Sequence, residues 1–183
     1  MDNGAAGYRR FLDGDDRGLA EIVGEYKDGL ILYLNGYTKN IHAAEELAED
    51  TFFRLITKKP VFSGRSSFKS WLYAIGRHVA LDWLRRRAHL APEEDLDALR
   101  ADEESLEEAY IGGEDRRALR RALGELAPDY RRVLWLVYFE DFSNREAAVA
   151  LGKSERQTRN LLYRAKLALK TELDREGFIY EKL

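Results

Sequence analysis

Apolar residues recur at helical spacing along most of the chain. In "KNIHAAEELAEDTFFRLI" the apolar stripe consists of Ile41, Ala44, Leu47, Ala48, Phe52 and Leu55. In "FKSWLYAIGRHVALDWLRRR" it consists of Phe68, Leu72, Ile75, Val79 and Trp83. Both sets repeat every three or four residues, as one face of an amphipathic helix requires, and strand-like alternation is absent. The pattern therefore predicts an all-α protein.

Breaks in this pattern divide the chain into two small helical domains. Residues 8–87 hold the first set of helices, and residues 114–173 hold four shorter ones, followed by a tail at 174–183. Residues 88–113 carry Pro92, Gly112, Gly113 and many acids but few apolar positions, so we expect an acidic flexible linker there.

The second domain contains two helices separated by a glycine turn. "SNREAAVALG" and "SERQTRNLLYRAKLALKTEL" each begin with a capping-box pattern, Ser143 with Glu146 and Ser154 with Gln157. Gly152 lies between them, where a left-handed turn is needed. Two short capped helices joined this way are typical of a helix-turn-helix.

The second helix of this pair has a polar cationic face. Thr158, Leu161, Leu162, Ala165 and Leu169 fall on one side. Arg and Asn side chains, which can bind base edges, fall on the other. A solvated basic surface is the alternative interpretation. The residues expected to contact duplex DNA are Lys153, Arg156, Gln157, Arg159, Asn160, Tyr163, Arg164 and Lys166.

Charge is segregated along the chain, although the formal net charge is only −3. Residues 65–87 and 153–170 each contain six Lys or Arg and one acid, whereas residues 88–115 contain eleven acids and one Arg. The sequence has no cysteine and only three scattered histidines, so we expect no metal and no cofactor. With no apolar signal core or membrane-length run, we expect a cytoplasmic protein without membrane insertion.

Two further segments have open interpretations. The helix "HAAEELAEDTFFRL" carries paired acids, which indicate either a solvated face or a docking surface for a basic partner. Catalysis is not expected, because no nucleophile or phosphate-binding loop accompanies these acids. The aromatic residues of "FSGRSSFKSWLYAIGRHVALDWLRRR" could hold unstacked bases, but their helical spacing favours core packing for most of them.

Three stretches together resemble the extracytoplasmic-function sigma factors, a two-domain class of bacterial RNA polymerase specificity subunit. "AAEELAEDTFFRL" resembles the family's polymerase-docking helix, and "FKSWLYAIGRHVALDWLRRR" resembles its FxxWLYRIARNxAxDxLRR helix. "LGELAPDYRRVLWLVYFEDFSNREAAVALGKSERQTRNLLYRAKLAL" resembles its C-terminal domain. His78 stands where Asn is usual, and Leu161 where Arg is common.

The resemblance implies a role for each surface in transcription initiation, with core RNA polymerase, promoter DNA and an anti-sigma factor as expected partners. The residues at 153–166 named above would recognise the −35 element. Docking to the core enzyme would involve Glu45, Glu46, Glu49, Asp50, Phe53 and Arg54. Contacts with the −10 element would involve Phe62, Ser63, Gly64, Arg65, Ser66, Arg77, His78, Arg85, Arg86 and Arg87.

The alternative interpretation is a stand-alone helix-turn-helix regulator, whose first domain senses a ligand or dimerises. A sigma factor needs the core enzyme to hold its two DNA-binding regions apart, whereas such a regulator would bind its DNA site alone.

Overall fold

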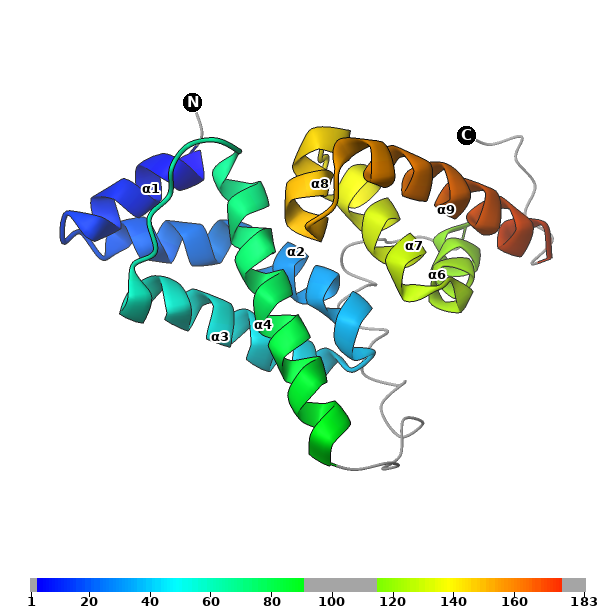
Figure 1. The fold of residues 1–183 in the computed structure, drawn as a ribbon, viewed down its shortest axis with the longest axis horizontal. Coiled ribbons are helices and arrows are strands. Elements are labelled where there is room, and N and C mark those ends of the chain that lie inside the picture. Colours follow the sequence, from blue (N-terminus) through cyan, green and yellow to red (C-terminus); the bar gives the residue numbers. More distant parts are fainter. Residues whose placement is uncertain (1–2, 91–114, 176–183) are drawn as a thin grey trace.

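The computed structural model describes residues 3–90 and 115–175, and the described residues form helices joined by short loops (Figure 1). The first unit, residues 3–90, contains α1 (Asn3–Leu12), α2 (Arg17–Thr38), α3 (Ile41–Lys58) and α4 (Phe68–Leu90). The second unit, residues 115–175, contains α6 (Asp115–Glu125), α7 (Pro128–Leu134), the π-helical turn η1 (Trp135–Phe139), α8 (Asn144–Leu151) and α9 (Glu155–Arg175). The predicted all-α class is confirmed.

In the first unit, α2 is the central helix and packs against α1, α3 and α4. The stripes predicted for α3 and α4 face this core, where Leu55, Phe68 and Leu72 are completely buried. The side chain of Asn40 caps α3 by accepting a hydrogen bond from the Ala43 N–H at 3.0 Å.

Helix α1 begins at Asn3, five residues before the predicted start at 8. Gly4 and Gly7 lower the helix propensity of the first residues of α1, so the sequence pattern did not predict a helix there. In the structure they allow close packing: a Cβ atom at Gly7 would lie 3.1 Å from the Gly18 carbonyl oxygen, and one at Gly4 would overlap the Phe68 ring. Tertiary contact therefore overrides the low propensity.

The second unit confirms the helix pair and both predicted capping boxes. Glu146 and Ser143 exchange hydrogen bonds at α8, and Ser154 and Gln157 do so at α9. Gly152 ends α8 with φ +61°, in the left-handed region. The apolar spacing of "APDYRRVLWLVYFED" predicts one helix over residues 127–141. Its last part is wrong, because the chain widens into η1 and then turns at Asp141, whose φ is +56°.

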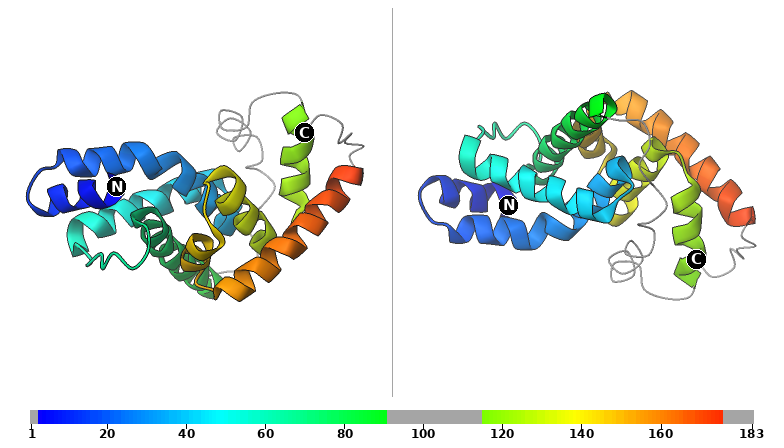
Figure 2. Two further views of the ribbon diagram at one scale, coloured as in Figure 1. Left: turned by 90° about the horizontal axis from the view of Figure 1, so that it is seen from above. Right: turned by 90° about the horizontal axis from the view of Figure 1, so that it is seen from below.

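The two units lie against each other, with α8 on α4 and α7 near α2 (Figure 2). Their buried apolar side chains form one continuous cluster, from Tyr8 in the first unit to Ala165 in the second. Of the predicted acidic linker, residues 88–90 belong to α4, and 91–114 lie outside the described residues. The tail is described only through Arg175.

Candidate functional site

The N-terminal half of α9 presents an exposed polar and cationic face. Its opposite side is held in the core by Thr158, Leu162 and Ala165, and the Thr158 hydroxyl donates to the Ser154 carbonyl at 3.1 Å. Arg159 lies near Glu155, with 3.6 Å between their charged atoms. The exposed residues on this face are Arg156, Arg159, Asn160, Tyr163 and Arg164. We refer to these five residues as the recognition face.

Three other residues expected at DNA make contacts within the chain. The Gln157 side-chain oxygen accepts the Ser154 N–H at 2.8 Å, so this amide serves the helix cap. Lys153 lies 3.7 Å from Asp129, and the Lys166 ammonium lies 5.4 Å from the centre of the Tyr138 ring. Lys153 and Lys166 therefore flank the recognition face.

The loop between α3 and α4 divides its predicted contact residues between core and solvent. Phe62 is partly buried, with its ring centre 5.2 Å from that of Trp71 and 5.6 Å from that of Phe68. Ser66 is also partly buried, whereas Ser63, Gly64 and Arg65 are exposed. The Phe62 ring thus anchors the loop, and the loop tip faces solvent.

The cationic residues of α4 also occupy different environments. His78 and the run Arg85, Arg86 and Arg87 are exposed. Arg85 pairs with Asp82 at 3.2 Å, and the Arg87 guanidinium lies over the Trp83 ring at 5.2 Å. Arg77 is partly buried and faces the second unit.

Helix α3 turns an acidic face with an exposed aromatic residue to solvent. Glu46, Glu49 and Asp50 are exposed, and Phe53 beside them is 60% exposed. Glu45 lies 3.4 Å from His42, and Arg54 pairs with Asp82 of α4 at 3.4 Å. A large exposed ring among carboxylates suits a partner surface that is both apolar and basic.

Tyrosines at the contact between the units have perturbed pKa values. Burial raises the pKa of Tyr33 well above its ordinary value, and nearby Tyr37 raises it further, whereas Arg132 and Arg77 act in the opposite direction. Burial likewise raises the pKa of Tyr37. Arg132 and Arg77 belong to different units, so charges from both units act on these hydroxyl groups.

Glu146 shows the electrostatic effect of its capping box. Burial raises the pKa of Glu146, but hydrogen bonds from the Ser143 backbone and hydroxyl outweigh that effect and hold the pKa below its ordinary value. Ser67 and Lys69 of the first unit lower it further. The first unit thus also stabilises the ionised form of Glu146, in the first turn of the helix-turn-helix.

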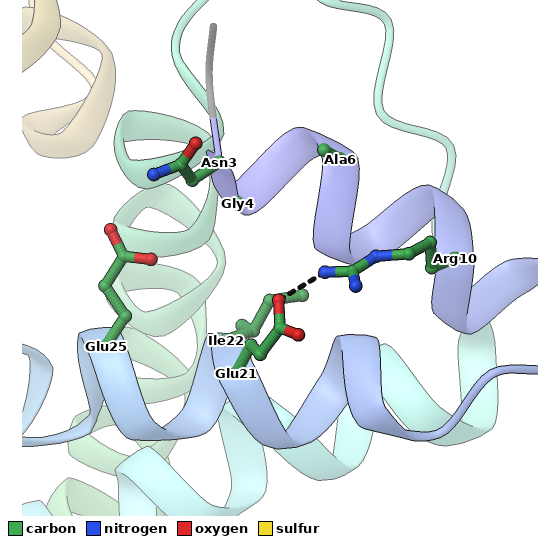
Figure 3. Close-up of a pocket in the computed structure, with 7 residues that line it drawn as sticks. All are labelled: Asn3, Gly4, Ala6, Arg10, Glu21, Ile22 and Glu25. Atoms are coloured by element: carbon green, nitrogen blue, oxygen red, sulfur yellow. Dashed lines mark hydrogen bonds and ion pairs between the residues drawn. The ribbon is translucent and has the colours of Figure 1, made fainter.

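A depression of about 310 Å³ lies between α1 and α2 (Figure 3). Arg10 and Glu21 form an ion pair across it, and Asn3, Ile22 and Glu25 complete much of its wall. Within residues 3–90 and 115–175, no group of three or more His, Asp or Glu side chains is placed to hold a metal ion. None of the sequence-predicted site residues lines this depression.

One buried charged residue was missed by the sequence analysis. Glu140, at the end of η1, is 5% exposed and contacts Tyr73 and Lys69 of α4. In the sequence it looks like an ordinary acid after an aromatic run. Only the π-helical turn, which no periodicity predicts, directs it into the first unit.

Comparison with known proteins accounts for both units. The Sigma-70 region 2 profile matches residues 22–89, and the Sigma-70 region 4 profile matches residues 116–169. The chain is 29% identical over 161 residues to RNA polymerase sigma factor YlaC of Bacillus subtilis, covering 85% of this chain and 91% of YlaC. It is 29% identical over 155 residues to ECF RNA polymerase sigma factor SigX of the same organism, covering 81% and 80%.

The chain belongs to the extracytoplasmic-function sigma factor family. It acts as an RNA polymerase sigma factor in transcription initiation. The matched regions lie within the two units described above, with the recognition face in region 4 and the acidic face of α3 in region 2.

Solved structures share the fold of this sigma factor. CnrH, solved with the cytosolic domain of CnrY, aligns over 94% of this chain and 98% of its own with a TM-score of 0.67 and 21% identity. RpoE from Bartonella quintana, solved with the anti-sigma factor NepR, aligns over 85% and 96% with a TM-score of 0.64 and 20% identity. Among the described helices of this sigma factor, none is long and apolar enough to cross a membrane.

Proposed function

We propose that α9 reads the −35 promoter element in the major groove. The observation that carries this proposal is the recognition face, whose Arg and Asn side chains project from the first turns of a helix held by a capped helix-turn-helix. Arg can bind guanine with two hydrogen bonds and Asn can bind adenine in the same way. Lys153 and Lys166, at its flanks, are suited to phosphate contacts.

The −10 element is assigned to the first unit. The solvent-facing loop tip, Ser63 to Arg65, offers small and cationic groups to a base displaced from the duplex. His78 and the three arginines at 85–87 extend this surface along α4. Arg77 and Phe62 complete the predicted set, with Phe62 supporting the loop through its contacts with Phe68 and Trp71.

The acidic face of α3 is assigned to docking on the core enzyme. Glu46, Glu49 and Asp50 supply charge complementarity, and Phe53 supplies an exposed apolar contact beside them. The chain would then position DNA while the polymerase carries out the chemistry, so it is not itself an enzyme. Binding by an anti-sigma factor stays a prediction from the family resemblance.

Run-off transcription on fragmented genomic DNA tests this function. With bacterial core RNA polymerase, the chain is expected to produce discrete transcripts whose start sites share upstream −35 and −10 sequences. Core enzyme alone is the control. Transcripts that do not depend on the added chain, or start sites without a shared upstream sequence, would contradict the proposal.

A further inference from the structure

Asp82 is the single acid in the basic block of residues 65–87. It lies in the C-terminal half of α4, three residues before Arg85. Residues three apart on a helix are neighbours on its surface. The carboxylate therefore lies among the arginines that are assigned to the −10 element, where a negative charge opposes binding to DNA.

The Asp82 carboxylate contacts arginines of two helices. Its Oδ1 atom lies 3.2 Å from Nη1 of Arg85, and its Oδ2 atom lies 3.4 Å from Nη2 of Arg54 on α3. The side chains of Asp82 and Arg54 are 41% and 39% exposed, whereas that of Arg85 is 71% exposed. Each oxygen thus meets a different guanidinium, and solvent reaches all three groups.

A second depression, of about 360 Å³, lies between α3 and α4 at this place. Its lining residues are Arg54, Asp82, Arg85 and Arg86, so cations outnumber the carboxylate three to one. Guanidinium groups bind carboxylates and phosphates through the same forked pattern of N–H donors. Asp82 therefore occupies the position that an external anion, such as a DNA phosphate, would take among these arginines.

Folding stability does not account for this arrangement. Ion pairs as exposed as these contribute little to stability, because water and salt screen them. Their effect on DNA binding is direct, since a phosphate that approaches Arg85 must compete with a carboxylate already in contact with it. The pairing therefore bears on DNA affinity more than on the fold.

The other basic block has a similar pair with a second explanation. Glu155 is the single acid of residues 153–170 and lies 3.6 Å from Arg159. It stands in the first turn of α9, where a negative charge also stabilises the helix end. Asp82 lies about two turns before the end of α4, so no such helix-end effect explains it.

We infer that Asp82 is an internal counter-ion of the DNA-binding surface: it occupies the place of a phosphate beside Arg54 and Arg85 and thereby lowers the affinity of the chain for DNA of arbitrary sequence. The inference rests on the proposed assignment of Arg85 to DNA. Genomic DNA offers a great excess of non-specific sites, which bind mainly through phosphates. A promoter adds base contacts, so it can displace the carboxylate where arbitrary sequence cannot.

Three variants separate the charge of Asp82 from its shape. Asp82→Asn keeps the shape and an acceptor oxygen but removes the charge, and Asp82→Glu keeps the charge. The control is Asp15→Asn, the same substitution at an acid that pairs with Arg17 at 2.9 Å. Asp15 lies in the loop between α1 and α2, away from the C-terminal half of α4 (Figure 1). Circular dichroism should show parental helix content for all three.

The first readout is the affinity of the free chain for a fluorescent duplex of random sequence, measured by anisotropy from about 50 to 200 mM salt. At the lowest salt, Asp82→Asn should raise this affinity by about three- to tenfold. The plot of log affinity against log salt should also steepen by about 0.9, the effect of one further phosphate contact. Asp15→Asn and Asp82→Glu should stay within about twofold of the parent, with the parental slope.

Two results of this titration overturn the inference. If Asp82→Asn matches Asp15→Asn in affinity and slope, the gain comes from net charge or is absent. If Asp82→Glu binds random DNA as tightly as Asp82→Asn, the shape of the side chain matters and its charge does not.

A double-mutant cycle tests whether Asp82 acts through Arg85. Asp82→Asn should raise the affinity for random duplex much less in an Arg85→Ala background, because the guanidinium that it releases is then absent. An equal gain in both backgrounds contradicts the counter-ion role.

The random-duplex assay involves no polymerase, so its outcome is independent of the proposed function. A chain that shows the expected response to Asp82→Asn but directs no run-off transcript refutes the proposed function alone. A chain that directs transcripts, while its Asp82→Asn and Asp15→Asn variants bind random DNA equally, refutes this inference alone.

Discussion

Reversing the charges of Glu46 and Asp50 to lysine is expected to weaken binding to core RNA polymerase by at least about 100-fold, because like charges brought together at an interface cost several kcal/mol. Both side chains are exposed on α3, one turn apart, beside the exposed ring of Phe53. Replacing them with lysine removes their attraction to a basic surface of the core enzyme and adds repulsion. The buried apolar stripe of α3 is not changed. Fluorescence anisotropy of the labelled chain titrated with core enzyme measures the effect.

A matched control distinguishes the loss of docking contacts on α3 from the effect of the changed net charge on core binding. Glu25→Lys with Asp28→Lys makes the same total charge change on the exposed side of α2. This control should bind core enzyme within about threefold of the parent, since charges outside an interface act mainly through long-range fields that salt screens. Circular dichroism should show parental helix content for both double variants. Equal loss of binding in the two, or loss of helicity in the α3 variant, would contradict the assignment of α3.

Replacing Arg159 or Asn160 with alanine is expected to reduce discrimination between a cognate and a mutated −35 element by about 1–3 kcal/mol, or about 5- to 150-fold. Both side chains are exposed on the recognition face, while the buried residues of α9 lie opposite. The loss should be confined to the base pairs that each side chain contacts. Competition between promoter variants for the holoenzyme measures it.

Arg175→Ala is the control for Arg159→Ala. Both arginines are exposed on α9 and both pair with a glutamate on the same helix, Glu172 and Glu155 respectively. Arg175 lies at the far end of the helix, so its loss should leave −35 discrimination unchanged. If Arg159→Ala and Asn160→Ala also leave it unchanged, α9 does not read DNA through this face.

Periodicity and capping patterns were enough to predict the all-α class, the helix-turn-helix and the orientation of α9. Leu161, Leu162 and Leu169 mark the inward side of α9, which begins at its capping box, so the outward position of Arg159 and Asn160 followed from spacing alone. The family resemblance added the expected partner of each surface. Charge patterning alone could describe these surfaces only as basic or acidic.

The contact between the units could not be predicted in the same way. It depends on the absence of a side chain at Gly36, on a π-helical turn that redirects Glu140, and on an arginine that crosses to a carbonyl of the other unit. Each is a long-range feature: Arg132 and Gly36 are 96 residues apart. Gly29 and Gly36 appear in the sequence as weak points in a helix, and only the opposite surface gives them a role.

The most direct test of the central claim compares promoter binding with and without core RNA polymerase in a gel-shift assay, using a duplex that carries both elements and a second duplex with a scrambled −35 sequence. The free chain should bind both duplexes weakly, with little preference. The chain with core enzyme should bind the intact promoter selectively. Tight, sequence-specific binding by the free chain, unchanged by core enzyme, would contradict the account.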